Sequence, residues 1–314
     1  MPDLSGVCRM GACSTKGCRV STPELIQRLR QRSSWRPILQ STFNIALFLL
    51  LAILTARSET PWLVRIVAWP LMGLVLAGFL NAAHDCAHSS FLDSKRLNYW
   101  AGVVWCVPLL ISFGLFKSFH LTHHKFNRRR GDPEPLAPIG SISEYCGRVL
   151  SYNPFRNILV ALRVARSSSR KLAGCNRVSR NELKIELLII LSWLALAVSL
   201  TVFFPTTILF AYWIPLLTFG PVVQATALPE HHGRPLSSDV FENTRTILSG
   251  PIVRAVLWNS GFHAEHHLFP FIPSCNLPIL HKLLDVRRDR DALTTYSKFH
   301  LSLLSQLLSG SQAA

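Results

Sequence analysis

Histidines gather in four short stretches of this 314-residue chain. The stretches read HDCAH at 84–88, HLTHH at 120–124, PEHHG at 229–233 and HAEHH at 263–267. Neutral imidazole is a preferred ligand of iron, zinc and copper. Spacings of three and four residues bring side chains onto one face of a helix, so each stretch can supply part of a metal site. The sequence therefore predicts transition-metal chemistry.

The number of histidines indicates two metal ions and not one. Twelve histidines in 314 residues would produce an HxxHH string by chance roughly 0.02 times, and the chain contains two. Unrelated core or surface histidines are therefore the poorer explanation. Nine imidazoles also exceed the set of about four ligands that fills a zinc site. Because the histidines have almost no cysteine beside them, an iron–sulfur cluster is not expected.

Iron suits this ligand set better than zinc. Zinc cannot change its oxidation state, whereas iron with nitrogen ligands and open positions binds dioxygen. Such a site at a membrane surface, roofed by apolar helices, fits a reaction of dioxygen with an unactivated C–H bond of a lipid. The helices would hold the alkyl chain and keep water from the reactive intermediate.

Composition indicates an integral membrane protein. Hydrophobic residues make up 49% of the chain and charged residues 16%, against roughly 25% charged in soluble domains. Residues 37–56 and 62–83 are apolar runs, the second interrupted only by Arg65, and residues 187–229 carry no charge and contain a turn at 204–207. About 20 apolar residues span a bilayer as a helix. We therefore predict an all-α integral membrane fold with four transmembrane helices in two hairpins.

Residues 97–116 form a further uncharged run of 20 residues. If this run crossed the membrane, HDCAH and HLTHH would lie on opposite faces and could not share a metal site. The crossing would also place residues 121–186, with 13 Lys and Arg against 5 Asp and Glu, on the outside, against the positive-inside bias. We therefore expect residues 97–116 to form a re-entrant or interfacial segment buried against the other helices.

Charge distribution predicts that both termini and the histidines face the cytoplasm. The first 36 residues carry seven Lys and Arg and two acids. Three parts are expected: a cytoplasmic tail over 1–36, a membrane domain over 37–302 with a cytoplasmic histidine-rich cap, and a C-terminal tail over 303–314. The membrane would be the inner or plasma membrane of a bacterium or the endoplasmic reticulum of a eukaryote.

Acidic residues lie beside the histidines in the sequence. Asp85, Glu230 and Glu265 each flank a histidine, and a carboxylate that accepts the free ring N–H of a metal ligand fixes the orientation of that ligand. The alternative is that these acids form salt bridges at the cytoplasmic face. The net charge of +16 also has two explanations: contact with anionic membrane lipids, or attraction of an acidic electron carrier or acyl carrier protein. No nucleic-acid partner is expected.

Over about residues 37–285 the chain resembles the membrane fatty acid desaturase and hydroxylase superfamily. The likeness rests on the ordered boxes HDCAH, HLTHH and HAEHH, on the paired hydrophobic segments, and on the strings HHKFNRRRGDPE and EHHLFPFIPSCNLPILHKLL. The resemblance implies an oxidoreductase with two non-heme iron ions and O2 as co-substrate. It assigns eight ligands to the boxes: His84, His88, His120, His123, His124, His263, His266 and His267.

The resemblance also suggests a ninth ligand, His231, in the EHxG-like string. His232 would point about 100° away from it on a helix, and His281 and His300 are expected at interfaces or on the surface. Asn259, in a string NSGFHAEHH similar to the third box of sphingolipid and bacterial acyl-lipid desaturases, is either a group near the metals or a turn residue. The box begins with His263 where front-end desaturases have Gln, which disfavours a front-end enzyme.

The chain lacks the HPGG haem-binding motif. Electrons would therefore come from an external donor of ferredoxin, rubredoxin or cytochrome type, with its reductase. The predicted function is a fatty acyl desaturase that uses O2 and two external electrons to form a C=C bond. A hydroxylase or ketolase of alkanes, carotenoids or sterols remains open, since alkane hydroxylases share the EHxG string. A metal transporter is disfavoured, because transporters place ligands inside their spans and the predicted spans contain no His, Asp or Glu.

Overall fold

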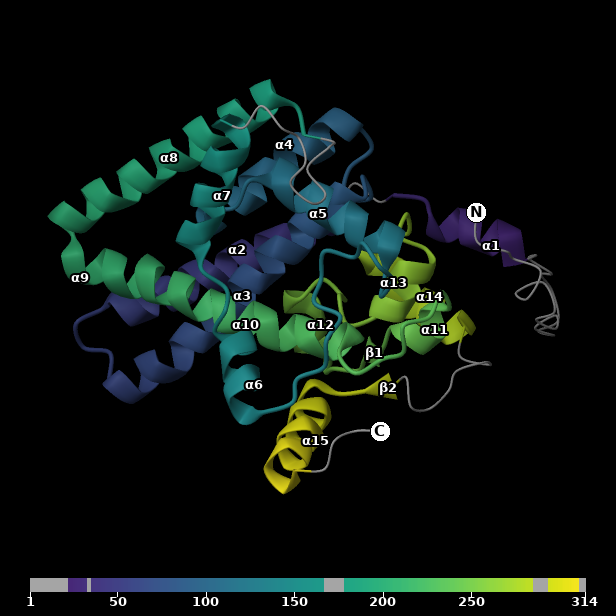
Figure 1. Ribbon diagram of the computed structural model, residues 1–314. Coiled ribbons are helices and arrows are strands. Elements are labelled where there is room, and N and C mark those ends of the chain that lie inside the picture. Colours follow the sequence, from purple (N-terminus) through teal and green to yellow (C-terminus); the bar gives the residue numbers. More distant parts are fainter. Residues whose placement is uncertain (1–21, 33–34, 167–177, 285–292, 311–314) are drawn as a thin grey trace.

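The computed structural model describes residues 22–32, 35–166, 178–284 and 293–310, and these form an almost wholly helical protein (Figure 1). Two short strands, β1 (Thr246–Ile247) and β2 (Leu293–Thr294), pair in parallel. The predicted all-α class is confirmed. Of the predicted N-terminal tail, residues 1–21 and 33–34 lie outside the described residues.

Four long helices are apolar enough to cross a membrane, as predicted. They are α2 (Trp35–Ala56), α3 (Trp62–Ala87), α8 (Arg180–Phe203) and a helix over Pro205–His231 made of α9 (Pro205–Ile208), a π-helical turn η4 (Leu209–Trp213) and α10 (Ile214–His231). Large apolar side chains such as Leu63, Leu188 and Phe203 are exposed on them. Helices that are apolar on all sides while lying at the surface fit a lipid environment. α3 packs between α2 and α10.

These helices extend beyond the uncharged runs of the sequence. α3 continues past Ala83 through HDCA, and α10 ends only at His231. α8 begins at Arg180, ahead of its apolar run, and therefore contains Glu186. Asp85 in the added turn of α3 and Glu186 in that of α8 are buried and accept hydrogen bonds. The helical hydrogen bonding therefore does not stop where the apolar run ends.

The segment over 97–116 bends sharply. α4 (Lys95–Cys106) leads through a 3-10 turn η2 (Val107–Leu109) to α5 (Phe113–Phe126), which is inclined by 106° to it. Glu186 of α8 is buried at the bend, where it accepts hydrogen bonds from the hydroxyls of Tyr99 and Ser112, both at 2.5 Å, and from the N–H of Gly114 at 3.1 Å. Ser112 in turn caps the start of α5. A single carboxylate thus joins α8, α4 and α5.

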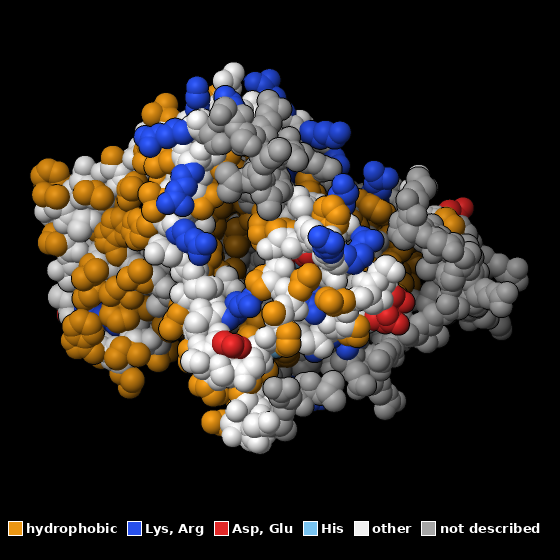
Figure 2. Space-filling view, viewed as in Figure 1, with side chains coloured by type: hydrophobic (Ala, Val, Ile, Leu, Met, Phe, Trp, Pro, Cys, Tyr) orange, Lys and Arg blue, Asp and Glu red, His pale blue; other side chains and the backbone are white. Residues whose placement is uncertain are grey.

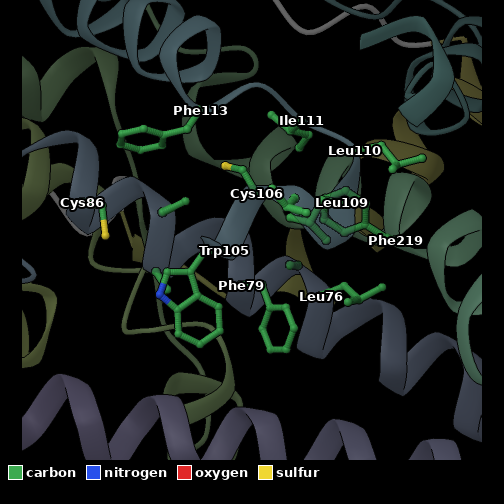
Figure 3. Close-up of a cluster of buried hydrophobic side chains, with 14 of the residues drawn as sticks. Leu76, Phe79, Cys86, Trp105, Cys106, Leu109, Leu110, Ile111, Phe113 and Phe219 are labelled. Carbon is green, nitrogen blue, oxygen red and sulfur yellow. The ribbon is translucent and has the colours of Figure 1, made fainter. Parts of the chain in front are cut away.

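The main hydrophobic core lies between α3, α4, η2, α5 and α10 (Figure 3). Its labelled members include Leu76 and Phe79 of α3, Trp105 of α4 and Phe219 of α10. The close contact between α4 and α5 depends on Gly102, because a Cβ atom there would lie 2.2 Å from the ring of Phe113. This core fixes α5, which carries HLTHH, against α3, which carries HDCAH.

The remaining helices surround one end of the long helices (Figure 1). They are α1 (Thr22–Leu29), α6 (Ile142–Val149), α7 (Pro154–Arg166), α11 (Val240–Asn243), α12 (Pro251–Val256), α13 (His263–Leu268), η5 (Ser274–Asn276), α14 (Leu277–Leu284) and α15 (Tyr296–Ser309). A second core joins α1 to α13 and α14 through Leu29, Phe262 and Leu280. The predicted boundary between residues 302 and 303 falls inside α15.

Candidate metal centre

Nine histidines from four helices converge on one region of the protein and divide into two groups. α3, α5 and α13 supply the five-histidine group, and α5, α10 and α13 supply the four-histidine group. Within each group the ligand nitrogens all lie within 4.8 Å of one another. The first group contains His84, His88, His120, His124 and His266, and the second contains His123, His231, His263 and His267. These are the nine histidines that the sequence analysis selected.

Separations between the Nε2 atoms match those of nitrogens that share an ion. In the four-histidine group, Nε2 of His263 lies 3.0 Å from that of His231 and 3.0 Å from that of His267. In the five-histidine group, Nε2 of His124 lies 3.0 Å from that of His266. Two nitrogens at about 2.1 Å from one ion and at right angles would lie about 3.0 Å apart.

Two further properties of the histidines fit a metal site: a buried ring nitrogen without a hydrogen-bond partner, and low pKa values. Nε2 of His84 is buried and has no hydrogen-bond partner among the described residues. Burial and the neighbouring imidazoles lower the pKa of His263, His266 and His267 well below the usual range. These rings are therefore neutral, with a lone pair free to bind a cation. The residues present fit two metal ions held by nitrogen.

Two contacts that the sequence analysis missed orient histidines of the four-histidine group. Nδ1 of His123 donates to Oδ1 of Asp132 at 3.0 Å, and Nδ1 of His231 donates to the backbone carbonyl of Asn243 at 3.1 Å. A ring that donates through Nδ1 keeps Nε2 free for a metal. Asp132 lies in the GDPE part of the string that follows HLTHH, and only that string could have drawn attention to it.

Asp132 is held ionised by its surroundings. Burial alone would raise the pKa of Asp132, but hydrogen bonds from His123 and from the N–H groups of Glu134 and Arg128 keep it below its usual range. The N–H of Arg128 lies 2.7 Å from Oδ2, and that of Glu134 lies 2.9 Å from Oδ1. The carboxylate thus anchors the turn after α5 and the ring of His123 together.

The acids next to the histidines in sequence have other partners. Oδ2 of Asp85 accepts a hydrogen bond of 2.5 Å from the hydroxyl of Ser274, while Oδ1 lies 3.8 Å from Nδ1 of His84, beyond hydrogen-bond distance. Oε2 of Glu230 lies 3.4 Å from Nε2 of His263. That nitrogen faces the other rings, so Glu230 approaches His263 on the metal-facing side and not at its free N–H.

Glu265 is fully buried, and two of its hydrogen-bond partners lie outside both histidine groups. It accepts a hydrogen bond from Nδ1 of His281 at 2.6 Å and another from the hydroxyl of Thr246 at 2.8 Å. The carboxylate therefore attaches α13 to α14 and to β1. His281, expected at an interface or on the surface, has this structural partner. His300 has two hydrogen-bond partners. The hydroxyl of Tyr145 lies 3.0 Å from its Nδ1, and the carbonyl oxygen of Ala225 lies 2.8 Å from its Nε2.

Asn259 and His232 lie outside both groups. Asn259 has a positive φ of 53°, and its N–H donates to the carbonyl of Arg254 at 2.9 Å. It therefore occupies a turn, the second of the two roles considered for it. Nε2 of His232 accepts a hydrogen bond from the N–H of Ile139 at 3.3 Å. Adjacent histidines at the end of α10 thus point to different surroundings.

Both histidine groups border one cavity of about 470 Å³. Histidines from both groups lie on its wall: His84, His120, His123, His263 and His266. The apolar part of the wall comes from α3, α5, α7 and α10, with Leu80, Leu115, Phe116, Phe119, Val160 and Val223. Figure 2 shows a hollow in this face of the molecule with hydrophobic side chains inside it. A largely apolar cavity of this size beside the histidines suits an aliphatic chain.

Comparison with known proteins gives a consistent picture. A sequence model of the fatty acid desaturase family matches residues 60–298. The chain is 26% identical over 283 residues to a chloroplastic omega-6 fatty acid desaturase of Glycine max, covering 83% of this chain and 65% of that protein. It is 24% identical over 270 residues to a probable fatty acid desaturase of Sorghum bicolor, covering 78% and 69%.

Bacterial relatives match over a shorter region. The chain is 30% identical over 110 residues to an sn-1 oleoyl-lipid 12-desaturase of Anabaena variabilis, which covers 35% of this chain and 30% of that protein. The matched region thus spans less than two thirds of the length of the soybean and Anabaena proteins.

Proposed function

The chain belongs to the fatty acid desaturase family, and from this premise we propose that it introduces a C=C bond into the acyl chain of a membrane lipid. In this reaction O2 takes two electrons and two protons from outside and two hydrogen atoms from adjacent methylene groups, and two water molecules form. An external carrier of ferredoxin, rubredoxin or cytochrome type, with its reductase, supplies the electrons. The observation that carries the proposal is that the two histidine groups border one apolar cavity.

The nine histidines would hold two iron ions, one in each group. When bound, the iron ions supply the redox chemistry that activates O2 at a C–H bond. Neighbouring groups would orient the ligands: Asp132 and the backbone carbonyl of Asn243 contact two rings of the four-histidine group. Phe116 stacks on His120 at 5.9 Å between ring centroids. Rigid ligands and the shape of the cavity would limit which carbon atoms can react.

The acyl chain would lie along the apolar wall formed by α3, α5, α7 and α10. Names of the relatives, omega-6 and oleoyl-lipid 12-desaturase, support a monounsaturated chain attached to a lipid as the substrate. A chain in this cavity would have methylene groups beside His84, His120 and His263, which line the wall. Phe116 and Phe119 add aromatic rings to this part of the wall.

We further propose that α2 with α3, and α8 with α10, form two membrane hairpins with the histidines and both termini on the cytoplasmic side. The basic residues support this orientation, since residues 121–186 carry 13 Lys and Arg against 5 acids. The bend between α4 and α5 also supports this orientation, because the chain turns back there and HLTHH can lie on the same side of the membrane as HDCAH.

Expression in a host with a defined lipid composition tests the function. Mass spectrometry of total acyl chains should reveal a species lighter by two hydrogens in cells with the wild-type chain, and none in cells with His123→Ala. His300→Gln is the matched control, because His300 lies outside both histidine groups. A species heavier by one oxygen atom would assign a hydroxylase instead. A product that persists in His123→Ala would separate the activity from the histidine centre.

A further inference from the structure

α7 forms a wall of the cavity and also part of the protein surface. Asn157 and Val160 line the cavity from the inner side of this helix. Phe155 and Leu159 are exposed on its outer side. One short helix therefore separates the acyl cavity from the surroundings, so groups on its outer side lie next to the path of a chain that enters there.

The outer side of α7 is basic as well as apolar. Arg156, Arg163 and Arg166 are exposed and lie on one helix face with Leu159, at spacings of three and four residues. Among the described residues, none of these guanidinium groups forms an ion pair with a carboxylate. The surrounding stretch, residues 145–181, contains eight Lys and Arg and no Asp or Glu. Cationic and apolar side chains mixed in this way are typical of helices that lie in an anionic membrane interface.

The position of α7 agrees with a place at the membrane surface. Ala161 of α7 packs against Leu183 and Leu187 in the first turns of α8, so α7 lies at one end of a candidate membrane span. Figure 2 shows Lys and Arg side chains beside the hydrophobic hollow. A lipid at this surface could bring a phosphate to the arginines and an acyl chain to the hollow at the same time.

We propose that α7 binds the phosphate of an anionic glycerolipid and guides one of its acyl chains into the cavity, so that anionic lipids are the preferred substrates. This inference rests on the proposed function, because it names the substrate of the same site. A thioester carried by a soluble partner would use the positive charge but not the exposed Phe155 and Leu159. These two apolar side chains favour a lipid surface.

Lipid binding can be measured without an electron donor. The purified protein is placed in nanodiscs of equimolar phosphatidylglycerol and phosphatidylcholine with identical oleoyl chains, and the lipids that remain bound after detergent extraction are identified by mass spectrometry. Each arginine should contribute about fivefold to the preference for phosphatidylglycerol, which corresponds to about 1 kcal/mol per charge near an anionic surface. The preference should be weakened in R163Q, weakened further in R156Q/R163Q, and retained in K298Q, in which an exposed cation on α15 is removed.

Substrate choice is measured in cells that contain phosphatidylglycerol and phosphatidylethanolamine. After a short pulse of labelled fatty acid, new double bonds should appear first in phosphatidylglycerol; R156Q/R163Q should remove this order, and K298Q should keep it. Equal formation in both lipids by the wild type, or formation only in soluble thioesters, would overturn the inference and leave the desaturase activity intact. The absence of new double bonds from every lipid and thioester fraction would count against the proposed function. The preference for phosphatidylglycerol measured in nanodiscs would then test the inference by itself.

Discussion

Nδ1 of His123 lies 3.0 Å from Oδ1 of Asp132, and the Asp132 side chain is completely buried. This contact joins a proposed metal ligand on α5 to the turn that follows it. A carboxylate that accepts the N–H of a ligand ring typically improves metal affinity by about 10- to 100-fold.

Asp132→Asn should therefore lower iron affinity by about 10- to 100-fold, because the amide lacks the negative charge that holds the His123 ring in place. Iron content per chain, measured by elemental analysis after dialysis against a weak chelator, checks this. Glu242→Gln is the control, since Glu242 is an exposed acid on α11. Full iron retention by Asp132→Asn would show that the contact does not support the metal.

Iron stoichiometry should separate the two histidine groups. The wild-type chain should take up about two iron ions after chelation and reloading, and His88→Ala or His231→Ala should each lower this number to about one, since each residue belongs to a different group. Removal of iron should also lower the thermal midpoint of unfolding, because only the folded chain brings the ligands together. Loss of both iron ions in either single variant would argue instead for one cooperative centre.

Glu186 should stabilise the bend between α4 and α5. Glu186→Ala removes the acceptor for Tyr99, Ser112 and Gly114, and each buried donor left without a partner costs about 1–3 kcal/mol. Thermal unfolding in detergent should show a large loss of stability. Glu182→Gln, one turn earlier on α8 and exposed, should change stability by less than about 0.5 kcal/mol. Equal behaviour of the two variants would refute the role of Glu186.

Two helical glycines should respond in opposite ways to alanine. Gly102→Ala places a methyl group against the ring of Phe113 and should destabilise the protein by about 1–3 kcal/mol through overpacking. Gly147→Ala meets nothing within 4 Å, so the gain in helix propensity should stabilise α6 by about 0.5–1 kcal/mol. Denaturant or thermal unfolding of the two variants in parallel checks the sign of each change.

Filling the cavity should block the substrate without displacing the metal. Val160→Trp adds a large side chain to the cavity wall, and we expect desaturation of long chains to fall by at least about tenfold, since the cavity can no longer hold the chain. Iron content should stay near that of the wild type. Leu301→Trp is the control, since Leu301 is exposed on α15, away from the cavity wall. Equal activity in both variants would place the acyl chain elsewhere.

Spacing and hydrophobicity predicted the main features for clear physical reasons. The three-and-four spacing of the histidines survives in α3, α5 and α13 because a helix fixes which side chains share a face. The apolar runs predicted the four long helices because a bilayer sets their length. Helix ends were less predictable: α3 and α10 continue into polar residues that face inward, so the end of an apolar run does not mark the end of the helix.

The carboxylates that contact the histidines were harder to predict, because neighbours in the sequence are not always neighbours in space. Asp85 and Glu265 adjoin histidines in the chain, but adjacent residues on a helix point about 100° apart, and these two carboxylates instead accept hydrogen bonds from Ser274 and His281. Asp132, nine residues from His123, reaches it because the chain turns back after α5. Such a contact depends on the path of a turn, which no periodicity encodes.

α13 supplies histidines to both groups, and its last histidine is residue 267 of 314. During biosynthesis neither group can be completed until the ribosome has released this helix. By then all four long helices have been made. If the two groups hold iron as proposed, loading would therefore follow the synthesis of all four long helices, and a chain truncated before α13 would lack His263, His266 and His267.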